Sequence, residues 1–217
     1  MDGSDKVKTF FERWARQFDS YYLEKKKPFS WKVLDYLFRR SMNDRLQLTL
    51  QECKTGRNVT ILDVGCGSGR CAVRLLRQSP CVLTGIDFSP EMIKIANEVV
   101  LEYRVQDRCR FILGEFGEIV FNEKFDICVA LGFFDYTKNP EIYLRKMKQI
   151  TTGKIIASFP AKWRLRNLIR ITRLKILNCP VYFYTVNRIK QILRDASIDD
   201  YKIRCIGRDY FVVARLS

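Results

Sequence analysis

Apolar residues recur every three or four positions near the amino terminus. They are Val7, Phe10, Phe11, Trp14, Ala15 and Phe18. This spacing predicts a helix, because positions three and four apart lie on the same helical face. A second and longer helix is predicted from Trp31 to Cys53, after the turn at Pro28. Residues 1–57 are therefore predicted to form a helical cap.

From residue 59 onward, short apolar runs alternate with helical stretches. Helices are predicted from Arg70, from Pro90, from Pro140 and over Asn187 to Ala196. The predicted strands are VTILDV, CVLTGI, CRFILG, FDICVAL, KIIASF, YKIRCI and YFVVARL. Such alternation predicts an α/β fold, in which a mostly parallel sheet of seven strands carries helices on both faces.

The whole chain, residues 1–217, is predicted to be one domain. Its 217 residues and 47% hydrophobic content are enough for one substantial core. No apolar stretch approaches the roughly 18 to 20 residues of a membrane span, and the start MDGSDKVK lacks a signal-peptide core. A cytoplasmic protein is therefore expected. Its predicted parts are the cap (1–57), a core (58–159), an insertion (160–184) and a closing helix with strands (185–217).

Composition narrows the chemistry. Thirty-nine Lys and Arg against 24 Asp and Glu give a net charge of +15, which favours anionic partners without naming one. The eight cysteines contain no C-x-x-C pair and the chain has no histidine, so the common zinc ligand sets are absent and no metal is expected. The cysteines are expected to be reduced thiols.

A glycine-rich turn, LDVGCGSGR, follows the first predicted strand. A dinucleotide-binding fingerprint would place its third glycine where Arg70 stands. The turn instead carries Gly65, Gly67 and Gly69, with Asp63 at the strand end. This D-x-G-x-G-x-G form resembles motif I of the class I methyltransferases that use S-adenosylmethionine. The resemblance extends over the following strands and into the tail.

The resemblance implies a Rossmann-like fold and S-adenosylmethionine as cofactor, with S-adenosylhomocysteine as product. Glycines allow the main chain to approach the methionine part of the cofactor, and Asp63 can organise the turn and the cofactor's ammonium group. The cofactor-binding residues that it implies are Asp63, Gly65, Cys66, Gly67, Gly69, Asp87, Phe88, Met92, Glu115, Phe116, Leu131, Gly132 and Tyr22.

Two carboxylates at strand ends carry the adenosine part of this prediction. Asp87 follows the second strand, where a carboxylate can accept hydrogen bonds from both ribose hydroxyls of a nicotinamide or an adenosine cofactor. Its alternative role, a helix cap, suits Ser89 better. The family commonly has an aspartate for the adenine amino group at the position of Glu115. A solvated loop carboxylate is the alternative there.

The family's closing helix usually begins with Tyr-Thr and ends with Ala-Gly-Phe. Here the segment reads YTVNRIKQILRDASI, and Ser197 replaces the glycine.

The segment ALGFFDY, after the fourth predicted strand, bears on the class of molecule that accepts the methyl group. It lacks the Asn/Asp-Pro-Pro-aromatic motif of nucleobase amino methyltransferases, the Pro-Cys of cytosine C5 enzymes and the paired glutamates of arginine methyltransferases. Small molecules are thus the leading acceptor class. The segments from RQFDSYY to RRSM, and the tail, resemble magnesium-protoporphyrin and ubiquinone methyltransferases. Asp135 and Tyr136 are the candidate catalytic residues; capping of the loop by Asp135 and packing of Tyr136 are the alternatives.

Methyl transfer needs mainly alignment and a nucleophile in its reactive form. Without histidine the usual base near neutral pH is missing, whereas a carboxylate acceptor needs no base and a phenol of pKa about 10 needs little help. We therefore predict O-methylation of an acidic or phenolic, amphiphilic small molecule. An RNA methyltransferase and a non-enzymatic, cofactor-binding regulator remain as alternatives.

The insertion carries a basic face formed by Lys162, Arg166, Arg170 and Arg173, at spacings of 4, 4 and 3. Three interpretations stay open. The face is solvated while the apolar side covers the active site, or it lies on an anionic membrane, or it contacts RNA phosphates. The second would add peripheral attachment at a membrane to the cytoplasmic location.

Overall fold

The computed structural model describes residues 7, 15, 16, 19, 42–54, 58–162 and 180–216. Several predictions lie outside these residues. They include the cofactor contact of Tyr22, most of the helical cap, and the basic face at Arg166, Arg170 and Arg173.

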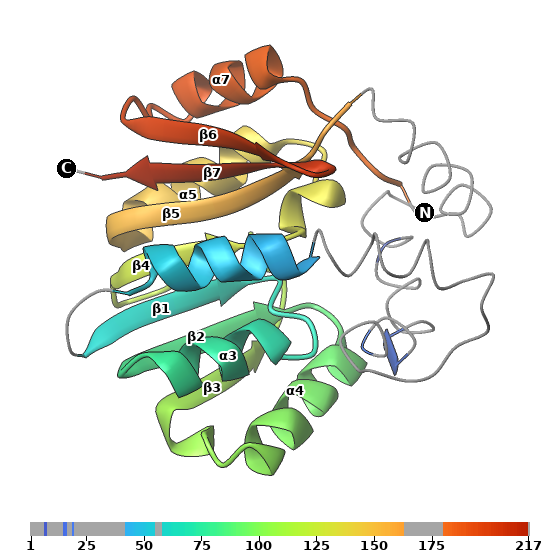
Figure 1. Cartoon of the computed structure of the whole chain (residues 1–217), viewed down its shortest axis with the longest axis vertical. Coiled ribbons are helices and arrows are strands. Elements are labelled where there is room, and N and C mark those ends of the chain that lie inside the picture. Colours follow the sequence, from blue (N-terminus) through green and yellow to red (C-terminus); the bar gives the residue numbers. More distant parts are fainter. Residues whose placement is uncertain are drawn as a thin grey trace.

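Within the described residues, seven strands form one sheet in the order β3-β2-β1-β4-β5-β7-β6. Strands β1 to β5 are parallel, and β7 pairs antiparallel with both β5 and β6 (Figure 1). The predicted mostly parallel sheet of seven strands is therefore confirmed. The strands are β1 (Val59–Val64), β2 (Cys81–Asp87), β3 (Cys109–Leu113), β4 (Phe125–Ala130), β5 (Thr151–Pro160), β6 (Tyr201–Ile206) and β7 (Asp209–Arg215).

Helices cover both faces of this sheet, as predicted. Their starts follow capping chemistry: the Ser89 hydroxyl accepts a hydrogen bond from the Met92 amide at the head of α4, and Thr185 accepts one from Arg188 at the head of α7. Beside a helix at residues 42–52, the helices are α3 (Arg70–Gln78), α4 (Pro90–Glu102), α5 (Pro140–Ile150) and α7 (Val186–Asp195), with short 3₁₀ turns η1 (Gln106–Arg108) and η2 (Phe133–Asp135).

Each face of the sheet has its own hydrophobic core, because successive strand residues point to opposite faces. In β1, Ile61 packs with the helix at 42–52, α3 and α4, whereas Leu62 and Val64 pack with α5 and α7. Figure 1 shows the first group of helices in front of the sheet and α5 behind it. Because both faces of the sheet are covered, the parallel strands β1, β2 and β4 read as nearly continuous apolar runs.

The two ends of the predicted insertion meet beside the sheet. Ala161 forms an isolated parallel bridge with Tyr184, the Lys162 amide donates to the Tyr184 carbonyl at 2.7 Å, and the Tyr184 amide donates to the Pro160 carbonyl at 2.8 Å. The Tyr184 hydroxyl is buried within hydrogen-bonding distance of the Phe134 and Thr137 carbonyls. Ala161 and Tyr184 thus lie side by side next to η2.

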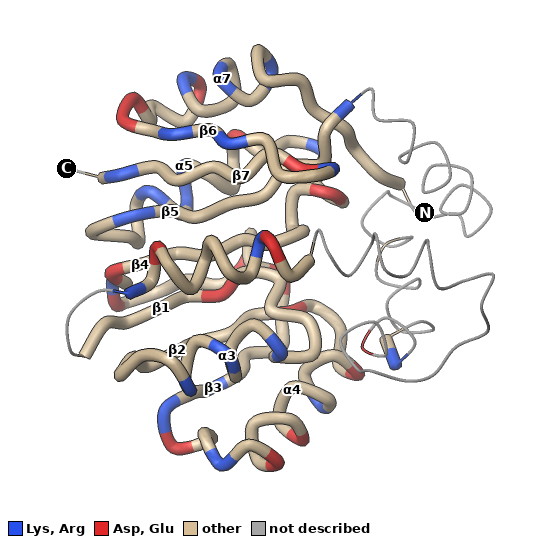
Figure 2. Tube along the Cα trace, in the orientation of Figure 1, with Lys and Arg blue, Asp and Glu red and all other residues tan. Residues whose placement is uncertain are grey.

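Charges and thiols on the described residues give little sign of a special surface. Figure 2 shows Lys and Arg spread over α3, α5, α7 and β6. No disulfide joins the seven cysteines in the described part of the chain. In that part, no helix is both long and apolar enough to cross a membrane.

Candidate functional site

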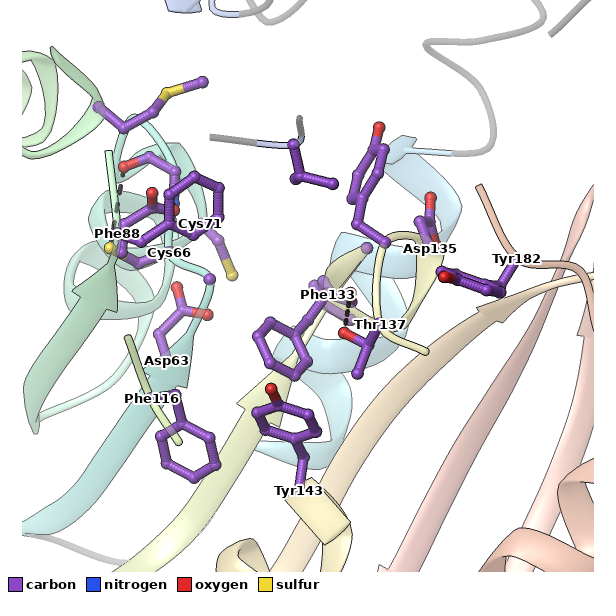
Figure 3. A pocket seen from close by; sticks show the side chains of 18 of the residues that line it. Asp63, Cys66, Cys71, Phe88, Phe116, Phe133, Asp135, Thr137, Tyr143 and Tyr182 are labelled. Atoms are coloured by element: carbon purple, nitrogen blue, oxygen red, sulfur yellow. Dashed lines mark hydrogen bonds between the residues drawn. The ribbon is translucent and has the colours of Figure 1, made fainter. Parts of the chain in front are cut away.

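A cavity of about 410 Å³ opens at the carboxyl ends of the parallel strands. Ligands of parallel α/β sheets bind at this edge, and the volume falls in the range of small-molecule sites. Figure 3 shows Asp63, Cys66 and Phe88 on one side of the cavity, Asp135 and Tyr182 on the other, and Phe133 between them. We call the first side the cofactor half and the second the acceptor half.

The glycine-rich turn forms a wall of the cofactor half. Gly67 has a φ of +53°, a conformation that L side chains rarely adopt, and a Cβ atom added there would meet no atom within 4 Å. The main chain at Gly67 therefore borders open space. Gly65 also lines the cavity, whereas Gly69 caps the start of α3 and is not among the lining residues. The predicted contact of Gly69 with a cofactor stays a prediction.

Asp63 is the most unusual side chain of the cofactor half. It is only 2% exposed, and its Oδ2 atom has no hydrogen-bond partner among the residues that the structure describes. Burial, and then the charge of Asp87, raise the pKa of its carboxyl to about 7. A buried acceptor of this kind favours a cationic hydrogen-bond donor in the cavity.

Asp87 links the second strand to the glycine-rich turn. Its carboxylate accepts a hydrogen bond from the Gly67 amide at 2.9 Å and another from the Ser89 amide at 2.9 Å. Burial raises the pKa of Asp87 to about 6, although these amides work in the opposite direction. The helix cap is Ser89, as predicted. Asp87 is thus held rigidly in the cavity wall, where two hydroxyls of one ligand can share its oxygens.

The predicted adenine contacts gather along the same side. Phe88, Met92, Glu115 and Phe116 all line the cavity. Met92 and Phe116 are buried, while Glu115 is exposed at the rim, which fits an adenine contact and a solvated carboxylate equally. Three apolar side chains and one carboxylate at the rim suit a flat heterocycle with a polar edge.

Cys66 lines this half as an un-ionised thiol. Burial, followed by the negative charges of Asp87 and Asp63, raises its pKa well above the ordinary value for cysteine. Burial, followed by the negative charge of Asp63, also raises the pKa of Cys71, a lining residue that was not predicted from the sequence. Neither sulfur is suited to act as a thiolate nucleophile.

The acceptor half begins where β4 ends. Leu131 and Gly132 line the cavity here, and their predicted contact with the cofactor stays a prediction. Asp135 and Tyr136 line the cavity as well. Asp135 is 3% exposed, and its carbonyl accepts a hydrogen bond from the Tyr182 amide at 2.8 Å. The structure thus brings both candidate catalytic residues into the cavity, where their roles remain predictions.

Aromatic rings surround this half. Phe133 packs edge-on against Tyr143 with ring centroids 5.3 Å apart, and edge-on against Phe116 at 6.3 Å. Such a wall favours an acceptor with a large apolar part.

Several lining residues lie outside the sequence predictions. Arg45, Arg208 and Asp209 bring charge into the acceptor half from distant parts of the chain. No local sequence signal marks Arg45, because the burial of the helix face around it is seen only in the structure. No cluster of His, Cys, Asp and Glu able to hold a metal ion occurs in residues that the structure describes.

The sequence profile of a family described as "Methyltransferase domain" matches residues 55–196, which contain β1 to β5, α7 and most of the cavity. The chain belongs to this methyltransferase family. Membership confirms the resemblance that was carried by the glycine-rich turn, and S-adenosylmethionine is the cofactor of the family.

Individual relatives of the family differ in what they methylate. A sterol 24-C-methyltransferase from Debaryomyces hansenii is 28% identical over 95 residues, which cover 43% of this chain and 25% of the relative. Human EEF1A lysine methyltransferase 2 is 30% identical over 117 residues, which cover 50% of this chain and 46% of the relative. The chain therefore spans less than half the length of these curated relatives.

Among solved methyltransferase structures, the magnesium protoporphyrin IX methyltransferase (ChlM) from Synechocystis PCC 6803, with bound SAH, has a TM-score of 0.78. It is 16% identical and the match covers 100% of both chains. At this identity the likeness shows the fold, and it confirms the resemblance to magnesium-protoporphyrin methyltransferases at that level.

The residues present fit the family's cofactor. The Oδ2 atom of Asp63 offers a buried acceptor for an ammonium group, and Gly67 leaves room for a ligand against the main chain. Asp87 lies twenty residues after Gly67 in the chain, yet its carboxylate accepts a hydrogen bond from the Gly67 amide. One connected wall can therefore hold both the methionine part and the ribose of the cofactor.

Proposed function

We propose that this protein transfers a methyl group from S-adenosylmethionine to an oxygen atom of a small, acidic or phenolic, amphiphilic molecule. The observation that carries the proposal is the buried Oδ2 atom of Asp63, without a partner among the described residues, in a cavity that also contains Asp87 and the glycine-rich turn. Family membership supports the reaction class, and the shape of the acceptor half supports a small acceptor.

The cofactor half binds and orients. Asp63 accepts a hydrogen bond from the cofactor's ammonium group, which favours its charged form and lowers its pKa from about 7. Asp87 accepts hydrogen bonds from the ribose hydroxyls while the Gly67 and Ser89 amides keep its carboxylate in place. Bound S-adenosylmethionine supplies a methyl group on a sulfonium sulfur, already activated for displacement.

The acceptor half aligns the second reactant. Phe133 and Tyr143 pack against the apolar part of the acceptor. If the acceptor is a phenol, Asp135 receives its proton; a carboxylate acceptor is already ionised and needs no such help. Since the chain contains no histidine, groups that are acidic on their own are the acceptors best served by this site.

The test supplies methyl-labelled S-adenosylmethionine and a cell extract to the purified protein. Label is counted after separation into organic-soluble, RNA and protein fractions, with Asp63→Asn as the matched inactive control. We expect label in the organic fraction. Treatment with mild base then distinguishes carboxyl methyl esters, which release methanol, from phenol ethers, which keep the label.

Other outcomes contradict the proposal in identifiable ways. Label in RNA assigns the site to a nucleic acid, and label in protein assigns it to a side chain. Label in no fraction, with S-adenosylhomocysteine bound in a titration, supports the regulator that binds the cofactor without turnover.

The predicted basic face of the insertion leads to a finer proposal about the acceptor's source. We propose that Lys162, Arg166, Arg170 and Arg173 contact an anionic membrane, from which an amphiphilic acceptor enters. Each cation adds about 1 kcal/mol to such binding at low salt. Sedimentation with vesicles of phosphatidylglycerol should be lost in Arg166→Glu/Arg170→Glu, and equal sedimentation of both proteins contradicts the membrane contact.

A further inference from the structure

The turn at Gly132 decides where the acceptor half begins. Strand β4 ends at Ala130, and Gly132, with a φ of +77°, starts the 3₁₀ turn η2 that carries Phe133 and Asp135. A left-handed residue reverses the chain direction sharply, so small changes at Gly132 move both side chains. Whatever holds the Gly132 main chain therefore sets the position of the acceptor loop.

Ser158 holds it from the neighbouring strand. The pairing between β4 and β5 stops at Ala130 and Ala157, so Gly132 lies beyond the last pair. There the Ser158 hydroxyl accepts a hydrogen bond from the Gly132 amide at 2.8 Å. Ser158 is 0% exposed, so the oxygen that accepts this bond is shielded from bulk water.

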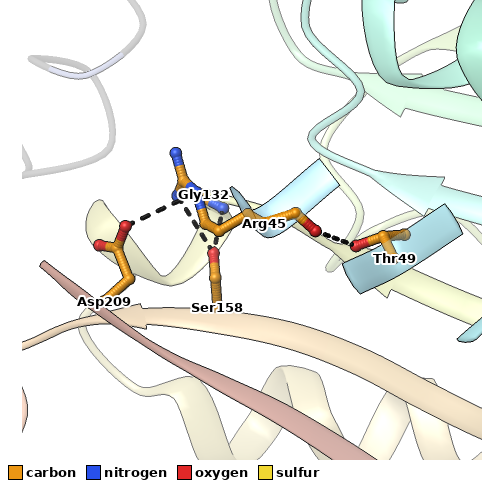
Figure 4. A network of polar contacts seen from close by, with 5 residues as sticks. All are labelled: Arg45, Thr49, Gly132, Ser158 and Asp209. Carbon is orange, nitrogen blue, oxygen red and sulfur yellow. Dashed lines mark hydrogen bonds and ion pairs between the residues drawn. The ribbon is translucent and has the colours of Figure 1, made fainter. Parts of the chain in front are cut away.

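Arg45 holds Ser158 in turn. Its Nη1 atom donates to the Ser158 hydroxyl at 3.3 Å, and its Nε atom lies 3.6 Å from Oδ2 of Asp209 (Figure 4). The side chains of Arg45 and Asp209 are 14% and 4% exposed, so this ion pair is largely removed from water. The helix at 42–52, the turn after β4, and strands β5 and β7 thus meet at one buried polar cluster.

This cluster stands in the cavity wall and reaches beyond the family's domain. Arg45, Gly132 and Asp209 all line the cavity. Gly132 and Ser158 fall within the matched residues 55–196, whereas Arg45 and Asp209 lie on either side of that range. The charged half of the cluster is consequently a feature of this chain that the family profile does not supply.

We infer that Arg45 and Ser158 are positioning residues for methyl transfer: they act through the Gly132 main chain to place the acceptor loop against the cofactor half. The inference rests on the proposed function for its kinetic consequence. It also has a structural consequence, the protection of the Gly132 amide from hydrogen exchange.

The first variant is Ser158→Ala, with Thr49→Val as its matched control. Thr49 is equally buried and lies on the same helix as Arg45. Among the residues that the structure describes, its hydroxyl donates only to the Arg45 carbonyl within that helix. We expect Ser158→Ala to lower kcat roughly 10- to 100-fold, because reactants displaced by about 1 Å react that much more slowly. The affinity of Ser158→Ala for S-adenosylhomocysteine should stay near the wild-type value, and so should the kcat of Thr49→Val.

A second pair of variants tests Arg45, the cation of the cluster. Arg45→Met removes the contacts with Ser158 and Asp209, whereas Arg45→Lys keeps the charge. We expect Arg45→Met to lower kcat at least as much as Ser158→Ala, and Arg45→Lys to restore part of the loss. Equal kcat values for wild type and Ser158→Ala overturn the proposal, as does an equal loss in Thr49→Val.

Hydrogen exchange separates this proposal from the proposed function. With ¹⁵N-glycine labelling the chain gives signals from only 11 glycines, and the Gly132 amide can be followed directly. We expect its exchange to accelerate roughly tenfold in Ser158→Ala, the loss of one buried hydrogen bond. Should the wild type transfer no methyl group to any acceptor, the proposed function fails and this measurement alone decides: unchanged exchange overturns the positioning role.

Discussion

The two halves of the cavity are built in different ways. In the cofactor half, Asp63, the glycine-rich turn and Asp87 come from two consecutive strand-to-helix connections, and Asp87 touches Gly67 directly. In the acceptor half, Arg45, Asp135, Tyr182 and Asp209 come from four separate parts of the chain. The comparison teaches that a short motif encodes the cofactor site locally, whereas the acceptor site exists only once the sheet has formed.

The largest effect is expected from removing the charge of Asp87. In Asp87→Asn, two charge-assisted hydrogen bonds to the ribose weaken, and affinity for S-adenosylhomocysteine should fall roughly 30- to 1000-fold. Calorimetric titration measures it, with Glu115→Gln at the exposed rim as the comparison variant. Undiminished affinity in Asp87→Asn would show that the ribose lies elsewhere.

The matching change in the acceptor half is Asp135→Asn. We expect kcat to fall by about 100-fold with affinity for S-adenosylhomocysteine unchanged, because Asp135 acts on the acceptor proton and not on the cofactor. Steady-state kinetics with the labelled acceptor check this. A kcat that stays at the wild-type value would indicate an acceptor that is already ionised and needs no base.

A pH series tests the part that Asp63 plays in the cofactor half. Asp63, with a pKa of about 7 against an ordinary 3.8, holds more protons folded than unfolded between these values, so stability without cofactor should decrease as pH rises from about 4 to 7. An ammonium group favours the charged carboxylate. Affinity for S-adenosylhomocysteine should therefore be roughly tenfold lower at pH 6 than at pH 8. Titrations of wild type and Asp63→Asn measure this, and the variant should lose most of the pH dependence.

The smallest effect lies outside both halves. Ser197 has a φ of +56° just after α7, and the Ile198 amide donates to the Leu193 carbonyl, an arrangement that favours glycine. Ser197→Gly should raise the free energy of unfolding by about 1 kcal/mol and leave kcat unchanged. Denaturant unfolding measures the gain; a loss of stability would show that the serine side chain contributes more than the strain costs.

The same comparison explains how much the sequence could predict. All seven strands were located from apolar runs, because strands such as β1, β2, β4 and β5 are buried on both faces and helices separate most of the parallel strands along the chain. Asp63, Gly67 and Asp87 were found from local spacing and lie together in the cavity. Arg45 was missed because its partner Ser158 is 113 residues away, and no local spacing encodes such a contact.

The meeting of Ala161 with Tyr184 has a consequence for the chain between them. The residues that flank segment 163–179 are joined by main-chain hydrogen bonds at the edge of the acceptor half. Lengthening or shortening a loop between fixed ends costs free energy that grows only with the logarithm of its length. At this junction the length of the intervening chain can therefore change at a small cost in stability, while the sheet and the cofactor half keep their structure.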